Sequence, residues 1–319
     1  MDKIHDTNIS FLRKYLDESQ FNWINYDSQI AISYFSSGGW THLYLIQNWK
    51  KKFLARINFF PGKNDWKVKK VEFETLKEIE HLNISPKAYV LNENNDLNQD
   101  LIIVEYIEGE NIVECSESDI IFLAKDLKKL HTFAKDYDKE QALPYQCSIY
   151  NEFSNGEDKK IEKYNFQDIE TIFSKYNSIK EDLGKWFNNL SLFDNCKNLC
   201  LCHGDLKSEN ILKTEKGIML IDWECSDIDI PETDIGRLFS WCTFTKEQQD
   251  IFLKEYYGKI PAEDIMNRIL SIKIVLDFFR IIENYCIYKR KPFNALNMLD
   301  DLNQYQKNLE VIKKITSYH

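Results

Sequence analysis

Apolar and polar positions along the first third of the chain follow first a helical and then a strand-like period. Residues 8 to 20 place Ile9, Leu12 and Leu16 at helical spacing with charged residues between them, which predicts an amphipathic helix. Short apolar runs then predict strands at residues 29–35, 41–47, 52–58, 87–91 and 101–106, with a helix at 65–82. This part of the chain is therefore predicted to be a sheet accompanied by helices.

The rest of the chain has mainly helical patterns. Apolar side chains spaced by three and four positions from Ile120 to Leu130 predict a helix, capped by Ser116 or Ser118, that ends near residue 134. Residues 135–160 are polar and irregular, and we interpret them as an insertion or loop. Further helices are predicted at residues 160–176, 178–192, 234–242, 246–257, 262–288 and 294–316.

Two short apolar runs, at residues 211–212 and 218–221, are separated by a polar turn that contains Gly217. Such runs predict a hairpin, which would bring Asn210 before its first strand close to Asp222 after its second. Carboxylate and amide oxygens suit Mg²⁺, which proteins usually hold with one or two carboxylates and the substrate phosphates. Asn210 and Asp222 are therefore candidate metal ligands.

A second acid, Asp205, precedes Asn210 by five positions in the stretch HGDLKSEN. It is free to accept a proton from an attacking hydroxyl, as the catalytic-loop aspartate of kinases does at the same spacing from an asparagine and a metal-binding aspartate. The alternative is a surface loop followed by a structural hairpin. Three polar residues at this joint spacing, with apolar strands between them, favour a phosphotransferase site.

Composition and net charge limit the classes of partner that the chain is expected to bind. The chain has 319 residues, of which 43% are hydrophobic and 29% charged, as in ordinary globular proteins. A formal net charge of −10 argues against nucleic acid and is compatible with a cationic substrate. No apolar signal core opens the sequence and no run of 18 apolar residues occurs, so we expect no membrane partner.

The eight cysteines show no paired C-x-x-C units. The closest group is Cys196, Cys200 and Cys202, beside His203. Zinc sites usually show such pairs, so buried free thiols are favoured over a zinc site. Reduced thiols fit a cytoplasmic protein.

The stretch HGDLKSEN followed by IDWE resembles the aminoglycoside phosphotransferase and choline kinase superfamily, which is related to protein kinases. Protein kinases have Arg after the His and a D-F-G motif. Gly204 and Trp223-Glu224 stand in those places here, which favours the small-molecule branch. The resemblance implies an α+β, bilobal protein-kinase-like fold. Residues 1–106 would form a nucleotide-binding lobe of antiparallel sheet plus helix, and residues 107–319 a mainly helical lobe with the catalytic loop and substrate site.

The resemblance also implies a site for ATP. Ser37, Gly38 and Gly39 would form a loop over the phosphates, although the sequence lacks G-x-G-x-x-G and a plain hairpin turn is the alternative. Arg56 stands where kinases carry the phosphate-contacting lysine, or is a strand arginine in a surface ion pair. We expect Arg56 to pair with a glutamate of the following helix. The residues implied for the pair and for the hinge that would bind adenine are Glu72 (with Glu74 as the alternative), Glu105, Tyr106 and Ile107.

In the second lobe, the resemblance implies structural roles around the catalytic loop. His203 is interpreted as holding this loop rather than as a catalyst, and Asp234 as bracing it from below. Lys207 would steady the transferred phosphoryl charge, or is a surface lysine. His131 is interpreted as a buried structural histidine or a partner of a helix C-terminus.

The residues that would determine the substrate are harder to identify from the sequence. Trp223 and Glu224 offer an aromatic and an acidic group, and Asp277 or Glu283 would face a substrate cation unless Asp277 forms an internal ion pair with Arg280. The alternative for the aromatic side chains is that they belong to the core.

The prediction is an ATP- and Mg²⁺-dependent kinase that phosphorylates the hydroxyl of a small cationic or polyhydroxylated molecule. A choline-like amino alcohol is slightly favoured over an aminoglycoside or another sugar. A protein kinase is disfavoured because D-F-G and A-P-E are absent. A catalytically silent kinase-fold binding protein is disfavoured because Asp205, Asn210 and Asp222 are all present.

Overall fold

The structure is a computed structural model, and it describes residues 2–19, 21, 30–38, 41–58, 68–93, 95–112, 114–133, 169–188, 198–282, 284 and 295–316. The chain divides into two compact units. The N-terminal unit consists of Met1–Ile112 and Glu209–Ser226, and the C-terminal unit of Val113–Ser208 and Asp227–His319. The chain thus leaves the N-terminal unit and later returns to it. The sequence predicts two continuous lobes, residues 1–106 and 107–319, without such a return. That division stays a prediction.

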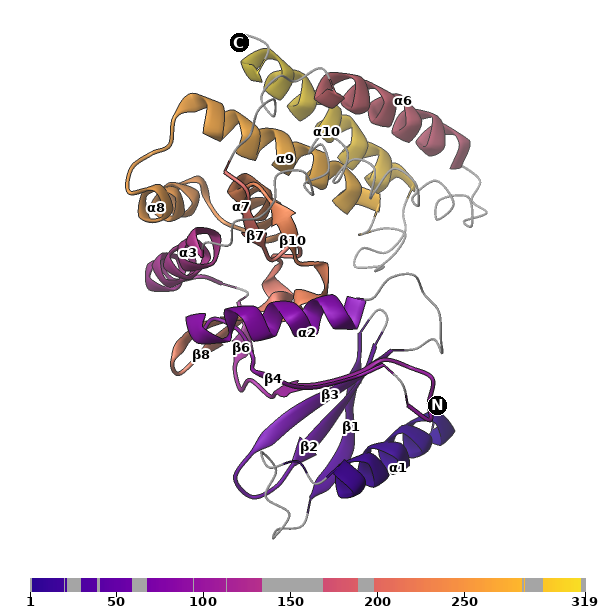
Figure 1. Cartoon of the computed structure of the whole chain (residues 1–319). Helices are drawn as coiled ribbons and strands as arrows, with labels where there is room; N and C mark the ends of the chain where they lie inside the picture. Colours follow the sequence, from indigo (N-terminus) through magenta and orange to yellow (C-terminus); the bar gives the residue numbers. More distant parts are fainter. Residues whose placement is uncertain are drawn as a thin grey trace. The chain divides into compact units, whose positions relative to one another are not determined.

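The N-terminal unit is built on a five-stranded sheet of order β1-β2-β3-β5-β4, in which every neighbouring pair is antiparallel. This confirms the antiparallel sheet predicted from the apolar runs. The strands, labelled in part in Figure 1, are β1 (Ala31–Ser37), β2 (Thr41–Gln47), β3 (Lys52–Asn58), β4 (Ala88–Asn92) and β5 (Leu101–Glu105).

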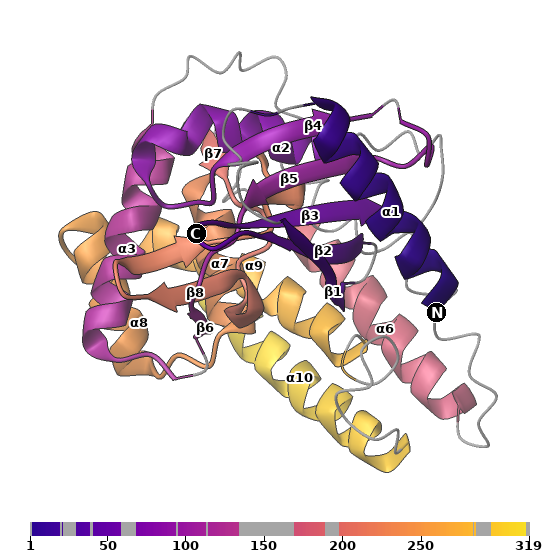
Figure 2. The ribbon, with the colours of Figure 1, turned by 90° about the horizontal axis from the view of Figure 1, so that it is seen from below.

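Helix α1 (Asp2–Ser19) covers one face of this sheet, as Figure 2 shows. Its buried Leu12 and Leu16 join a core cluster that includes Ala55 and Ile57 of β3. Because successive side chains of a strand point to opposite faces, Arg56 lies on the other face. Helix α2 (Val68–Ile79), which ends in the short 3₁₀ helix η1 (Glu80–Leu82), contacts the sheet through β4 and β5.

The returning segment adds a second, three-stranded sheet to the N-terminal unit, in the order β6-β8-β9. Its strands are β6 (Glu110–Asn111), β8 (Ile211–Thr214) and β9 (Gly217–Leu220), and the 3₁₀ turns η4 (Ser208–Asn210) and η5 (Trp223–Cys225) flank the hairpin. The N–H of Leu220 donates to the carbonyl of Ile84 at 2.8 Å, which ties β9 to the chain just after η1. The predicted hairpin is therefore confirmed.

The C-terminal unit is mainly helical, with one small antiparallel pair formed by β7 (Cys200–Cys202) and β10 (Asp227–Asp229). Helices α6, α9 and α10 enclose an apolar cluster that contains the buried Tyr176, Phe278 and Leu302. Helix α3 packs on α8, and α7 on α9. The helices are α3 (Glu117–Thr132), α6 (Ile169–Asn188), α7 (Pro231–Trp241), α8 (Lys246–Tyr257), α9 (Glu263–Ile282) and α10 (Ala295–Thr316).

Local signals explain where several of these helices begin. Ser116 forms a capping box with Asp119 at the start of α3, so Ser116 rather than Ser118 is the cap. Thr245 and Gln248 form the same arrangement at α8. Helix α7 begins with Pro231 at its first position, three residues before the predicted start at residue 234.

The structure corrects one prediction and leaves another outside its range. Between residues 169 and 188, where one helix was predicted to end at 176 and another to begin at 178, the structure has the single helix α6, because Tyr176, Ile179 and Leu183 continue one buried stripe across the expected break. The polar insertion predicted at residues 135–160 lies outside the described residues. Among the described helices, none combines the length and apolar character needed to cross a membrane.

Candidate active site

The hairpin β8–β9 brings the two candidate metal ligands together. Ile211 pairs with Leu220, and the N–H of Ile221 donates to the carbonyl of Asn210 at 2.9 Å. Asn210 is 4% exposed, and Asp222 follows Ile221 directly. Asp222 has φ 68° and ψ 62°, a left-handed conformation that is unfavourable for most side chains and that aspartate tolerates better than most. The hairpin thus supplies an amide and a carboxylate side by side.

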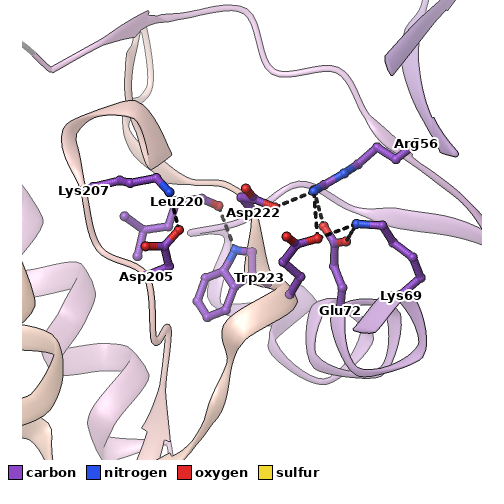
Figure 3. Close-up of polar contacts among 9 residues, drawn as sticks. Arg56, Lys69, Glu72, Asp205, Lys207, Leu220, Asp222 and Trp223 are labelled. Atoms are coloured by element: carbon purple, nitrogen blue, oxygen red, sulfur yellow. Dashed lines mark hydrogen bonds and ion pairs between the residues drawn. The ribbon is translucent and has the colours of Figure 1, made fainter. Parts of the chain in front are cut away.

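Arg56 lies at the centre of a cluster of charged groups in the N-terminal unit (Figure 3). Its guanidinium bonds Glu72 of α2 and Asp222, and its Nη2 lies 3.6 Å from Glu224 Oε2. Burial opposes the charged form, but these three carboxylates outweigh it and raise the pKa of Arg56 above its ordinary value. Arg56 is therefore permanently charged.

The helix glutamate that pairs with Arg56 is Glu72, as predicted, and the alternative Glu74 is excluded. The side chain of Glu72 is 1% exposed, whereas that of Glu74 is 64% exposed and lies 3.7 Å from Lys70. The two differ because α2 turns only one of these positions towards β3.

Lys69 belongs to the same cluster and was missed in the sequence. Its side chain is 0% exposed, and its Nζ lies 3.1 Å from Glu72 Oε2 and 2.6 Å from Glu224 Oε2. A lysine on a polar helix is usually solvated, so only its spacing of three positions before Glu72 could have marked it.

The predicted phosphate loop follows β1. The N–H of Gly38 donates to the carbonyl of Thr41 at 2.9 Å, which closes a tight turn between β1 and β2. Ser37 Oγ lies 3.0 Å from the hydroxyl of Tyr34 and 2.9 Å from His42 Nδ1. The third predicted residue, Gly39, lies outside the described residues.

The predicted hinge follows β5. The N–H of Glu105 donates to Lys87 at 2.8 Å and that of Tyr106 to Lys52 at 3.2 Å, both onto main-chain carbonyls. These two donors are committed to neighbouring strands. Within the described part of the chain, the N–H of Ile107 has no main-chain partner of this kind, and its predicted role towards adenine stays a prediction.

In the C-terminal unit, Asp234 braces the main chain ahead of Asp205. Its carboxylate accepts from the N–H of His203 at 2.7 Å and from that of Gly204 at 3.0 Å. Gly204 has φ +79°, which only glycine adopts without strain. The N–H of Asp205 in turn donates to His203 Nδ1 at 3.2 Å. These bonds bear out the structural interpretation of His203 and of Asp234.

His131 completes this brace. It is buried, with Nε2 3.1 Å from Asp234 Oδ2 and Nδ1 2.7 Å from the hydroxyl of Tyr256. Burial alone would lower the pKa of His131, but its hydrogen bond to Asp234 raises the pKa to about 9. The same bond lowers the pKa of Asp234 against the effect of burial. The two side chains are therefore an imidazolium and a carboxylate.

Lys207 lies next to Asp205, with Nζ 2.6 Å from Asp205 Oδ2 (Figure 3). Both side chains are about a quarter exposed, at 23% and 24%. Asp205 and Lys207 belong to the C-terminal unit, and Asn210 and Asp222 to the N-terminal unit. The predicted catalytic pair therefore lies within the C-terminal unit, and the two predicted metal ligands lie within the N-terminal unit.

The predicted substrate residues have other partners. Trp223 is fully buried and its indole donates to the carbonyl of Leu220 at 2.8 Å, which favours the alternative that this aromatic is part of the core. Glu224 is held by Lys69 and Arg56. As substrate residues, both stay predictions.

Asp277 on α9 forms the internal ion pair that the sequence offered as an alternative. It lies 3.4 Å from Arg280, bonds Lys273, and accepts from Ser240 Oγ at 2.7 Å. Its role towards a substrate stays a prediction, and Glu283 lies outside the described residues.

The five described cysteines are free thiols, in agreement with the sequence. Cys200 Sγ and Cys202 Sγ lie 3.7 Å apart, and they donate to the main-chain carbonyls of Asp229 and Ile230, respectively. Burial raises the pKa of the Cys202 thiol well above its ordinary value. Both thiols are buried members of the core.

The sequence was compared with known protein families and known proteins. A family model described as choline/ethanolamine kinase matches residues 32–273. The chain is 23% identical over 239 residues to a protein described as a LicA homolog of Metamycoplasma hominis, covering 74% of this chain and 84% of that protein.

Solved structures also share the fold, and two of them illustrate it. A choline kinase from Cryptosporidium parvum has a TM-score of 0.63 at 17% identity, with 92% of this chain and 94% of that chain covered. A spectinomycin phosphotransferase solved with ADP and spectinomycin has a TM-score of 0.56 at 17% identity, with 92% and 94% covered. These likenesses show the protein-kinase-like fold and confirm the resemblance to the superfamily.

Proposed function

Because the chain belongs to the choline/ethanolamine kinase family, we propose that it transfers the γ-phosphoryl group of ATP to the hydroxyl of a choline-like amino alcohol. As a member of this family, it is a small-molecule kinase. The observation that carries the proposal is the extent of the family match. Residues 32–273 include Arg56 and the three polar residues Asp205, Asn210 and Asp222.

Asp205 is proposed to take the proton of the acceptor hydroxyl. Its main chain is held through His203 and, one step further back, through the Asp234 carboxylate. A fixed main chain keeps the carboxylate in one place, which is what a positioned general base requires. Lys207, at 2.6 Å, would neutralise Asp205 until the alcohol arrives and then lie beside the transferred phosphoryl group.

Asn210 and Asp222 are proposed to hold Mg²⁺. Their oxygen donors suit this ion, and the pairing of Ile221 with Asn210 keeps the two ligands on neighbouring chain segments. When bound with ATP, the ion would neutralise charge on the β- and γ-phosphates. Arg56 offers a planar fork of donors to the phosphates, the turn at Ser37 and Gly38 would cover them, and Ile107 would donate to the adenine.

The acceptor is proposed from the family and from charge. The proteins in the matched family are described as choline or ethanolamine kinases, and the net charge of −10 favours a cationic substrate over a neutral sugar. Free thiols and the use of ATP support a cytoplasmic location.

The test measures phosphoryl transfer to four acceptors and the effect of one substitution on that transfer. Purified protein with ATP and Mg²⁺ is offered choline, ethanolamine, an aminoglycoside and a hexose, and phosphorylated products are identified by mass. We expect phosphocholine or phosphoethanolamine. Asp205→Asn should lower kcat by about 10²-fold or more while the affinity for ADP stays within about twofold, because a general base acts on the transfer step.

A matched control removes another lysine-paired aspartate. Asp250 on α8 lies 2.8 Å from Lys246 in an exposed ion pair, and Asp250→Asn should leave kcat unchanged. Transfer by Asp205→Asn at the wild-type rate would refute the role of Asp205. Phosphorylation of the aminoglycoside or hexose alone would refute the choice of acceptor.

A further inference from the structure

A fully buried lysine on α2 needs a physical explanation. Burial of an ammonium group is costly unless it is paired. The side chain of Lys69 is 0% exposed. The compensation comes from Glu72 and Glu224, which lie 3.1 and 2.6 Å from its Nζ.

The carboxylates around Lys69 are close enough together to compete for a metal ion. Single oxygens of Glu72, Asp222 and Glu224 all lie within 4.8 Å of one another. Three carboxylates at this spacing offer more negative charge than Asn210 with Asp222 does. A divalent cation would therefore prefer this cluster to the Asn210–Asp222 pair if nothing else filled it.

Two side chains fill it. Arg56 bonds Glu72 and Asp222, and Lys69 bridges Glu72 and Glu224. In the proposed function, Arg56 binds the nucleotide phosphates and Asp222 binds the metal ion. Lys69 has no such second task, because both of its partners lie within the cluster.

We propose that Lys69 is a built-in cation, which occupies the space between Glu72 and Glu224 so that Asp222 alone of the three carboxylates binds the catalytic metal. This inference rests on the proposed function for the role of Asp222. Lys69 is a positioning residue, since its fully buried side chain acts through Glu72 and Glu224. The metal would then bind together with the nucleotide rather than before it.

The experiment measures metal binding without nucleotide. Mn²⁺ is titrated into the full-length protein by calorimetry or by its spin resonance signal, for wild type, Lys69→Met and Lys69→Gln. Glutamine can still hydrogen bond to the two glutamates, so it covers the case in which the methionine variant does not fold. The matched control is Lys70→Met, which removes the neighbouring lysine of the same helix, 39% exposed and paired with Glu74.

We expect wild type and Lys70→Met to bind Mn²⁺ weakly without nucleotide, and the two Lys69 variants to bind it about tenfold or more tightly, because one repelling charge is gone. Lys69→Met combined with Glu224→Gln should return to weak binding, since one carboxylate is removed with the lysine. In kinase assays, the Lys69 variants should be inhibited by Mg²⁺ concentrations that wild type tolerates. A lysine that only stabilised the fold would lower Tm and move neither readout.

Folded Lys69 variants with Mn²⁺ binding as weak as that of wild type would overturn the inference. Variants that fold only when Mn²⁺ is present would support it, because the metal would replace the ammonium group. Variants that fold under neither condition would overturn it. Metal binding alone does not test the kinase reaction, so a wild type that phosphorylates no amino alcohol would refute the proposed function without touching the metal result.

Discussion

At the scale of single residues, the position of Asp205 depends on buried groups behind the loop that carries it. Asp234 holds two main-chain N–H groups and is itself held by His131. The ion pair of His131 and Asp234 is therefore part of the fold's stability as well as of the site. Its contribution depends on pH in a direction that can be worked out.

The pKa of His131 is raised from 6.5 to about 9, so the folded state binds its proton more tightly than the unfolded state does. The stabilisation is complete below pH 6.5 and is lost as pH rises through 9. A shift of this size corresponds to a free energy on the order of 3 kcal/mol. We expect the unfolding free energy of wild type, measured in urea, to fall between pH 6.5 and 9 by more than that of His131→Gln.

The comparison with a variant is needed because burial also raises the pKa of Asp229, from 3.8 to about 7, so this carboxyl still titrates at the lower end of that pH range. The difference between wild type and His131→Gln isolates the histidine. His81, which is exposed on η1, provides the control, and His81→Gln should follow wild type. Parallel pH profiles for wild type and His131→Gln would contradict the assignment.

Residues whose type and spacing both carry information could be predicted from the sequence. Asp205, Asn210 and Asp222 stand out by their spacing around a hairpin, and Glu72 was chosen because its position resembles that of the paired glutamate in the superfamily. Lys69 could not be identified, because its neighbours Lys70 and Glu74 are exposed and the local sequence is evenly charged. Its burial depends on Glu224, which lies 155 positions away in the chain.

At the scale of elements, the close approach of α7 and α9 fixes the helix that carries Asp234. Gly236 lies one turn after α7 begins, and a Cβ at this position would come 2.6 Å from Ile272 Cγ2 and 2.9 Å from Ile272 Cβ. No real Cβ makes contacts this short. The absence of a side chain at Gly236 is what lets the helices touch.

We predict that Gly236→Ala destabilises the protein by about 1–3 kcal/mol, because an added methyl group over-packs a filled interface. Thermal unfolding should show a lower Tm, and activity should fall with it as Asp234 is displaced. In an Ile272→Ala background, which removes the closest methyl group, the cost of Gly236→Ala should shrink. An unchanged Tm for Gly236→Ala would show that α7 and α9 can separate freely.

Element lengths explain which parts of the fold the sequence predicted. The five strands of the large sheet have clear apolar runs, but β6 and β10 span only Glu110–Asn111 and Asp227–Asp229. Such short polar strands carry no period and exist because β8 and β7 pair with them. The break predicted within α6 was wrong for the opposite reason, since tertiary packing continued a stripe that the local sequence left ambiguous.

At the scale of the whole molecule, the N-terminal unit is not a continuous piece of chain. Residues 209–226 supply Asp222 and Glu224 to Arg56 and Lys69, and β8 to β6. Without this segment, two buried cations would face Glu72 alone. The unit therefore needs both of its segments to balance its charges.

We predict that a fragment of residues 1–112 does not fold cooperatively, and that the same fragment joined by a short linker to residues 209–226 does. The measurement is near-ultraviolet circular dichroism during heating. Adding Asp222→Asn and Glu224→Gln to the linked form should lower its Tm, because the two cations lose their partners. A cooperative transition of equal Tm for the 1–112 fragment alone would contradict the prediction.

Because the N-terminal unit consists of two separate chain segments, it cannot be completed until the second segment has been synthesised. A ribosome adds roughly 5–20 residues per second, so on the order of ten seconds pass between the emergence of β5 and that of Glu224. During this interval, Arg56 and Lys69 must stay hydrated, and the edge that β6 and β8 later share stays open. The N-terminal unit is thus completed only after residues 113–208 of the C-terminal unit have been made.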